Sequence, residues 1–367
     1  MKYDFETIID RDPAIRGTGK YRIMKASKGN KPPKGIVPLS VADMEFRTAP
    51  CVIDAIKAEA DFGVLGYHRL TDSFRESCCQ WMKTRHDWDV QPDWIVPFEQ
   101  VVPALYNAVW TFTQPGDGIL IQTPDYHHFT GATVNTGRKV LENRLVADEK
   151  GHYTVDFDDF REKAKQAKLF FLCSPQNPTG RVWTEEELRR MMELCLKHHV
   201  LVVSDEIHSD LIFHGKRHTP TASVSDEAAR YVVTGISGTK TFNLAGLQAS
   251  TVVFPNAHMK QVFDQFWMNM DIHRNNAFSL TAMEAAFNHG EEWLEQLLPY
   301  LSANFDFVAD YCREHIPQIK TCAPDATYLM WLDCRALGLD NDALRRQLAE
   351  AGCPQRAELP FHKMLLD

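Results

Sequence analysis

The chain has 367 residues, 44% of them hydrophobic and 24% charged, and a formal net charge of −9 at pH 7. This composition is typical of a soluble globular protein with two domains, or one large and one small, and its acidity without a long basic run excludes an ordinary nucleic-acid partner. Nine cysteines without a CxxC pair, a polar N-terminus and no long apolar stretch lead us to predict a cytoplasmic protein with no membrane partner.

The first part of the chain begins with an arm of low periodicity. Residues 1 to about 35 are rich in Gly, Pro, Lys and Arg, which predicts extended structure, and a short apolar run ending in acids follows at residues 36–46. Apolar residues at helical spacing predict one helix over 50–62 and a second that begins at Asp72, with a turn at 66–69 between them.

The next segment places a helix N-terminus directly after a strand. Residues 95–97 are predicted to end a strand, and residues 104–113 have helical periodicity. The turn between them would offer backbone N–H groups of Val101, Val102 and Ala104 to a phosphate, because Pro103 has no N–H. An ordinary strand-to-helix turn explains the same residues equally well.

A single aromatic residue follows the next predicted strand. Residues 119–122 are an apolar run after a Pro-Gly turn, and Tyr126 lies in the loop beyond it. Ligands of open α/β sheets bind at the carboxyl ends of strands, so Tyr126 is placed to stack on a planar ligand. The alternative is a tyrosine that only packs.

Strands and helices then alternate along the chain. Buried strands are predicted over residues 168–173, 200–203, 231–236 and 249–254. Thr184 and Glu187 form a capping box, which predicts the start of an amphipathic helix between the strands at 168–173 and 200–203. Alternation of this kind indicates an α/β fold whose sheet is at least partly parallel.

Three polar residues beyond strand ends fit one ligand. Asp205 ends an apolar strand, where a carboxylate needs a cationic partner such as a protonated pyridine nitrogen. Asn177 offers an amide to a phenolate-type oxygen, and Lys240 can form a Schiff base with an aldehyde whose phosphate Ser237 and Thr239 bind. Pyridoxal phosphate carries all these groups. The alternative for Lys240 is a surface lysine in a polar loop.

Longer motifs carry a resemblance to a known family. Residues 174–180 (SPQNPTG), 204–210 (SDEIHSD) and 239–247 (TKTFNLAGL) resemble the class I/II aminotransferase family, pyridoxal-phosphate enzymes of fold type I. Four further stretches are similar to its MalY/PatB-type branch of cystathionine β-lyases, or C–S lyases: residues 41–46 (VADMEF), 66–67, 101–105 and 205–208. The resemblance spans about residues 2 to 352.

The resemblance implies a fold and an assembly. We expect a large domain with a mostly parallel seven-stranded sheet and a smaller α/β domain. The expected boundaries are 1–47 for the N-terminal arm and part of the small domain, 48–285 for the large coenzyme-binding domain and 286–367 for an incomplete small C-terminal domain. The family also implies a homodimer with shared active sites and an amino-acid substrate.

The resemblance assigns roles residue by residue. Lys240 is the catalytic lysine that holds the coenzyme, Asp205 holds the pyridine nitrogen, and Asn177 and His208 contact the side of the ring that carries the hydroxyl. The resemblance also implies that Tyr126 stacks on the ring and that Val101, Val102, Ser237 and Thr239 bind the phosphate. Tyr67 would contact the phosphate in the neighbouring subunit, and the substrate would contact Ala42, Tyr126 and Asn177.

Three departures from the family pattern stand out. Gln100 precedes Val101 where the branch usually has glycine, and Gln248 stands where classical aminotransferases often have a phosphate-binding arginine. Residues 353–367 match nothing in the family, so we expect a truncated or divergent C-terminus. The arginine that grips the substrate carboxylate has no evident match, since the flanks of Arg356 do not resemble its motif.

The favoured function is β-elimination on cystathionine or another cysteine S-conjugate, which gives pyruvate, ammonia and a thiol. The alternatives are an aminotransferase and a non-catalytic regulatory protein that retains the coenzyme site. A metal cluster of Asp205, His208, Asp210, His214 and His218 is disfavoured, because these residues lack a metal-binding signature. Residues 328–333 are predicted to form a strand of the small domain.

Overall fold

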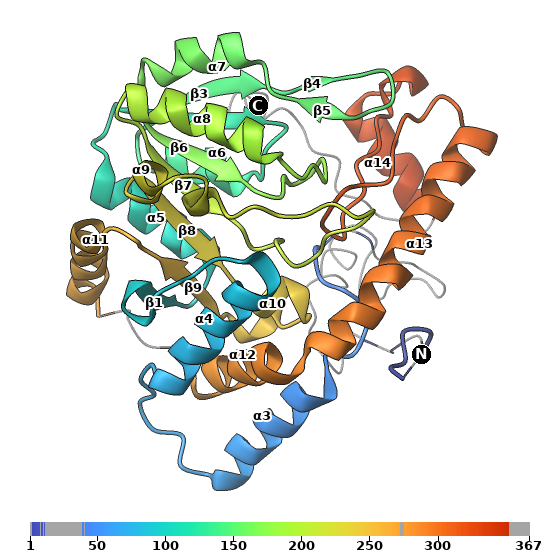
Figure 1. The fold of residues 1–367 in the computed structure, drawn as a ribbon. Helices are drawn as coiled ribbons and strands as arrows, with labels where there is room; N and C mark the ends of the chain where they lie inside the picture. Colours follow the sequence, from blue (N-terminus) through green and yellow to red (C-terminus); the bar gives the residue numbers. More distant parts are fainter. Residues whose placement is uncertain are drawn as a thin grey trace.

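The structure, a computed structural model, describes residues 2–7, 9, 11, 39, 41–271 and 275–351. Its centre is a seven-stranded sheet in the order β1-β9-β8-β7-β6-β2-β3 (Figure 1). The strands are β1 (Ile95–Phe98), β2 (Gly118–Thr123), β3 (Lys139–Arg144), β6 (Ala167–Cys173), β7 (Leu201–Asp205), β8 (Val232–Ile236) and β9 (Ser250–Val253).

The sheet is mostly parallel, as predicted. Strand β9 is antiparallel to both of its neighbours, β1 and β8, and the other adjacent pairs are parallel. Every strand predicted within residues 95–254 is present, and β3 is an addition at the edge. The fold class is therefore α/β with a central doubly covered sheet.

Alternating side chains of the strands enter two separate cores. Ile119, Leu169 and Phe171 pack in one core, and Leu120 and Phe170 pack in the other. Helices α5 (Val101–Phe112), α6 (His128–Asn135) and α11 (Ala257–Asn269) cover the first face, whereas α7 (Phe157–Ala164) and α8 (Glu185–Lys197) cover the second. Burial on both faces explains why the central strands are continuous apolar runs.

The remaining elements surround this three-layer core (Figure 1). Helices α3 (Pro50–Phe62) and α4 (Asp72–His86), which begin where the sequence predicts, pack against α12 (Ala277–His289). The other elements are the hairpin β4 (Val146–Ala147) and β5 (Tyr153–Thr154), the short helices α9 (Asp226–Ala229) and α10 (Gly238–Thr241), the long α13 (Glu291–His315), α14 (Asn341–Glu350), and the 3-10 turns η1 (Pro92–Trp94), η2 (Thr221–Ser223), η3 (Ala245–Leu247) and η4 (Arg335–Leu337).

Two predicted elements differ in the structure. Helix α5 begins at Val101 rather than Ala104, because the Ala104 N–H donates to the Gln100 carbonyl (3.4 Å) and Pro103 is tolerated in a first turn. Residues 328–333 are not a strand. A strand needs a neighbour to pair with, and within 328–333 the described structure has only the isolated bridge of Asp333 with Lys320. Just before this segment, Ala326 forms a second isolated bridge with Ile212 and Thr327 has φ 73°.

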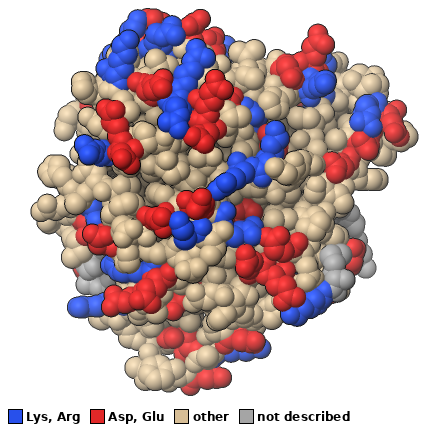
Figure 2. Space-filling view, viewed as in Figure 1, with Lys and Arg blue, Asp and Glu red and all other residues tan. Residues whose placement is uncertain are grey.

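Two further features are the distribution of charge on the surface and the hydrophobicity of the helices. Lys and Arg side chains are intermixed with Asp and Glu side chains on the face shown in Figure 2. Across the described ranges, no helix is both long enough and apolar enough to cross a membrane.

Candidate active site

The pairing of β7 with both β6 and β8 gathers Asn177, Asp205, His208 and Lys240 at the carboxyl ends of these three strands. Cys173 of β6 lies opposite Asp205, and Asp205 lies opposite Gly235 of β8. The segments that follow these three strands therefore leave the sheet side by side. They carry Asn177, His208 and Lys240.

Lys240 lies in the four-residue helix α10, whose N-cap is Ser237. The half-buried Lys240 donates from Nζ to the Ala42 carbonyl oxygen at 2.8 Å. Burial lowers the pKa of this amine, and the carboxylates of Asp43 and Asp205 oppose the shift only partly. A lysine whose neutral form is favoured in this way is suited to nucleophilic and base chemistry.

Asp205 is the buried acid of the site, with 3% of its surface exposed. Burial raises the pKa of Asp205 to about 7, against the hydrogen bond from the Ile207 N–H (3.2 Å) and the charge of Lys240. A carboxyl that is ionised at this position needs a cationic partner close by.

His208 is a second buried group with unused hydrogen-bonding capacity. Burial, reinforced by the charge of Lys240, lowers the pKa of His208 to about 3, so the imidazole is neutral. Its Nδ1 atom is buried and has no hydrogen-bond partner within the described residues. Its ring meets the Tyr328 ring edge to face, with centroids 5.7 Å apart.

These three side chains fit pyridoxal phosphate. The carboxyl of Asp205 matches a protonated pyridine nitrogen, and the unpartnered Nδ1 of His208 supplies a hydrogen-bonding group for the ring's polar edge. The amine of Lys240 matches the aldehyde. Pyridoxal phosphate is thus the cofactor that the chemistry of this site accommodates.

The segment of residues 41–46, which we call the strap, is bound to the loop that follows Lys240. Asn243 accepts from the Met44 N–H (3.0 Å) and donates to the carbonyls of Met44 (2.9 Å) and Phe46 (2.8 Å). Arg11 pairs with Asp43 (2.9 Å) and Glu45 (3.0 Å) on the strap. Two motifs nearly 200 residues apart in the sequence are therefore one structural unit.

The predicted phosphate-binding residues lie at two helix N-termini. Val101 and Val102 begin α5, but Ala104 already donates within the helix and is not available. Gln100 has φ −153°, an extended conformation open to any residue, so the turn does not need glycine. At α10, the hydroxyl oxygens of Ser237 and Thr239 are 2.7 Å apart, and Ser237 also donates to the Ala249 carbonyl (2.6 Å).

The other predicted residues differ in their exposure. Tyr126 is half-buried in the loop after β2, with its ring edge to face against Phe129 (5.8 Å). Asn177 is half-buried after β6. Tyr67 is 92% exposed in the loop between α3 and α4, so this chain does not enclose it. Arg356 lies outside the described residues, and the Gln248 side chain is exposed.

Two acids that follow Asp205, Glu206 and Asp210, form buried pairs with histidines. His86 is 2.9 Å from Asp210, and His218 is 2.9 Å from Glu206. Asp210 also accepts from the Thr241 hydroxyl (2.7 Å). Over the residues that the structure describes, no group of three or more His, Cys, Asp or Glu side chains could hold a metal ion.

Sequence reasoning missed two residues of the site, Asn243 and Tyr328. The Tyr328 hydroxyl donates to the same Ala42 carbonyl as Lys240, also at 2.8 Å. Asn243 lies in the motif of residues 239–247, and the resemblance assigns no role to its side chain. For Tyr328 no local signal exists, because its role depends on the contact with the strap 286 residues away.

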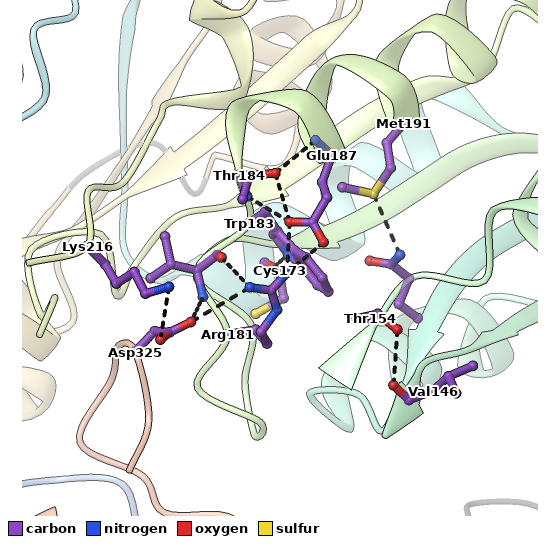
Figure 3. A network of polar contacts seen from close by, with 12 residues as sticks. Val146, Thr154, Cys173, Arg181, Trp183, Thr184, Glu187, Met191, Lys216 and Asp325 are labelled. Atoms are coloured by element: carbon purple, nitrogen blue, oxygen red, sulfur yellow. Dashed lines mark hydrogen bonds and ion pairs between the residues drawn. The ribbon is translucent and has the colours of Figure 1, made fainter. Parts of the chain in front are cut away.

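The segment that carries Tyr328 is joined to the loop after β6 by a polar network (Figure 3). Arg181 binds Glu187 through two contacts (2.6 and 2.8 Å) and lies 3.8 Å from Asp325, which Lys216 also approaches to 3.8 Å. The Ala326 N–H donates to the Gly180 carbonyl (2.9 Å). These contacts fix the position of the residues just before Tyr328.

Comparisons with known proteins identify the family of the chain and its fold. The family profile described as Aminotransferase class I and II matches residues 34–356. The cystathionine β-lyase PatB of Bacillus subtilis is 40% identical over 318 residues, which cover 86% of this chain and 82% of PatB. Protein MalY of Escherichia coli is 32% identical over 351 residues (95% and 88%). Cystalysin of Treponema denticola, whose structure contains pyridoxal 5'-phosphate, superposes with a TM-score of 0.91 at 36% identity (95% and 88%).

Proposed function

The chain belongs to the class I and II aminotransferase family, in its branch of pyridoxal phosphate-dependent C–S lyases, and we propose that it catalyses β-elimination on L-cystathionine or another cysteine S-conjugate. The reaction breaks the Cα–H and Cβ–S bonds, the thiolate leaves and takes up a proton, and hydrolysis of the remaining three-carbon product by one water gives pyruvate and ammonia. The observation that carries the proposal is the likeness to PatB over most of both chains, because that protein is named as a cystathionine β-lyase.

When bound, pyridoxal phosphate supplies an aldehyde that condenses with amines and a ring that accepts the electron pair of a broken Cα–H bond. We assign the removal of the Cα proton to the Lys240 amine, whose pKa burial lowers. Asp205 holds the proton of the ring nitrogen, and the neutral His208 contributes a hydrogen-bonding group at the ring's edge.

The proposed binding residues surround these three groups. Val101, Val102, Ser237 and Thr239 bind phosphate at the N-termini of α5 and α10. Tyr126 packs on the ring, and the substrate amino acid contacts Ala42, Tyr126 and Asn177. The strap excludes water from one side of the Lys240 amine, since the Ala42 carbonyl already occupies that direction.

The test is pyruvate release from cystathionine by the full chain with pyridoxal phosphate and no keto acid. We expect pyruvate and a free thiol in equal amounts. Lys240→Ala should abolish the release, whereas Lys197→Ala, at an exposed position in α8, should retain it. No pyruvate from any cysteine S-conjugate would refute the proposed elimination.

Transamination is the second candidate, because the matching family is named for aminotransferases. In that reaction Lys240 would again move the proton taken from Cα, and the Cβ–S bond would stay intact. A second assay, with a keto acid added to the same mixture, separates the two reactions. Amino-group transfer to an added keto acid, without thiol release, would establish the aminotransferase.

A further inference from the structure

Tyr328 is the one side chain from the C-terminal part of the described structure that shares a hydrogen-bond partner with Lys240. Its hydroxyl and the Lys240 amine both donate to the Ala42 carbonyl oxygen, each at 2.8 Å. A carbonyl oxygen has two lone pairs, so it can accept both donors at once. The two donors then compete for the electron density of one acceptor.

The backbone around Tyr328 is held in an unusual conformation. Thr327 is fully buried and has φ 73°, a left-handed conformation that a β-branched residue rarely adopts. Its N–H donates to the Leu211 carbonyl (2.9 Å), and Ala326 is bound to Gly180. Such conformations persist where the surrounding structure imposes them, and they concentrate at functional sites. The fold therefore directs the Tyr328 side chain towards the strap.

The environment keeps the Tyr328 hydroxyl protonated. Burial and the charge of Asp43 raise its pKa, with Tyr126 adding to the shift. A phenol that does not ionise remains a donor throughout the reaction. When Lys240 leaves the Ala42 carbonyl for the coenzyme, that carbonyl still has a partner, so the strap need not move.

We propose that Tyr328 is a positioning residue of the active site, whose hydroxyl shares the Ala42 carbonyl with Lys240 and thereby weakens the hold of this carbonyl on the lysine's ammonium form. This inference rests on the proposed role of Lys240 as the reactive amine. The other charged and titratable groups around that amine are Asp43 on the strap, Asp205 at the end of β7 and His208 just after it.

The test measures Lys240 itself, without substrate. The full chain, freed of coenzyme, is labelled with trace acetic anhydride across a pH series, and the label on Lys240 is quantified by mass mapping. Only the neutral amine reacts. In Tyr328→Phe the carbonyl would bind the ammonium alone, so the labelling midpoint should move to higher pH and the rate below it should fall about three- to tenfold.

A matched control and a second variant make the result decisive. Tyr311→Phe, at a half-exposed position in α13, should leave the Lys240 profile unchanged. Replacing Tyr328 with a ring-fluorinated tyrosine keeps the shape but strengthens the donor, so Lys240 should label faster than in the wild type. If neither change at Tyr328 moves the profile in folded protein, Tyr328 has no influence on Lys240 and the inference is wrong. Because cystathionine is absent, failure of the proposed lyase activity would not affect this result.

Discussion

At the scale of single residues, burial decides which protonation states the site can use. It acts on Asp205 and Lys240 in opposite directions, raising the pKa of the acid and lowering that of the amine. Even with the charge of Lys240 nearby, a carboxyl with a pKa of about 7 is only partly ionised at neutral pH. The ionised state of Asp205 and a bound pyridinium therefore stabilise each other.

Replacing this acid tests the mutual dependence. We expect Asp205→Asn to lower kcat by about two orders of magnitude, because an amide cannot keep the ring nitrogen protonated. Retention of pyridoxal phosphate should change less, since the phosphate and lysine contacts are untouched. Absorbance titration with the coenzyme and steady-state kinetics measure the two effects separately. Equal turnover in the variant and the wild type would show that Asp205 does not hold the ring nitrogen.

The identity of the reactive lysine can be checked directly. We expect borohydride treatment of the protein with pyridoxal phosphate to leave a covalent adduct on Lys240. This lysine is half-buried, and burial lowers the pKa of its amine. Peptide mass mapping locates the adduct. An adduct confined to another lysine would contradict the assignment of the site.

At the scale of elements, the turn after β6 and the segment before Tyr328 depend on one glycine. Gly180 has φ 71°, and a Cβ added there would overlap the Cβ of Pro324. Gly215 has a similar φ of 68° but open space around it. The two positions thus share the backbone strain and differ in the contact.

This pair of glycines allows the contact to be isolated. We expect Gly180→Ala to destabilise the protein by about 1–3 kcal/mol more than Gly215→Ala, through overpacking against Pro324. Denaturant unfolding measures the difference. Activity should also fall in Gly180→Ala, because Ala326 and Tyr328 would shift with Pro324. Equal stability of the two variants would show that the segment around Pro324 moves aside without lowering the free energy of unfolding.

The buried pairs behind the site predict how stability depends on pH. Burial raises the pKa of Asp210, but the hydrogen bond and charge of His86 and the hydrogen bond of Thr241 outweigh it, so the pKa lies below that of an ordinary aspartate. A carboxyl with a lowered pKa stabilises the fold above its unfolded pKa and loses that contribution as pH falls through the folded value.

Asp210→Asn should therefore cost stability near neutral pH and matter less in acid. We expect a loss of about 3 kcal/mol at pH 7, typical of a broken buried pair, that shrinks as the pH falls below about 4. Unfolding of both proteins over a pH series measures it. Asp61→Asn, at an exposed site in α3, serves as the control. A loss independent of pH would mean that packing, and not charge, makes Asp210 important.

What the sequence could predict follows from the range of the interactions. Runs such as residues 168–173 predict their strands because burial on both faces leaves a local pattern, and Thr184 with Glu187 predicts the start of α8 because capping is local. The failures are long-range. The segment 328–333 lacks a neighbouring strand to pair with, apart from the single bridge of Asp333 with Lys320, and the role of Tyr328 depends on the strap. Neither feature leaves a mark on the neighbouring sequence.

At the scale of the whole molecule, the predicted division into domains can be refined. The boundary between residues 285 and 286 falls inside α12, which packs with α3 and α4. Because a boundary rarely cuts a helix that is part of a core, we propose to place it at Gly290, between α12 and α13.

The loop between α3 and α4 carries the surface expected of a dimer contact. Tyr67 is 92% exposed, and Phe62, Val64 and Leu65 beside it are 70%, 66% and 54% exposed. Exposed apolar residues that cluster in this way mark interaction sites. We propose that a second copy of the chain covers this loop and that Tyr67 reaches the phosphate site of that copy.

Mixing two variants, each of which we expect to be inactive alone, tests the shared site. In a homodimer of this kind, a subunit with Lys240→Ala and a subunit with Tyr67→Phe form one site that lacks both groups and one that has both. Random mixing in equal amounts should thus restore about a quarter of the wild-type activity, because half of the dimers are hybrids with one intact site of two. Light scattering should first establish that each variant is dimeric. If Tyr67 acts within its own chain, every hybrid site would lack one group, and mixing would restore no activity beyond the sum of the separate variants.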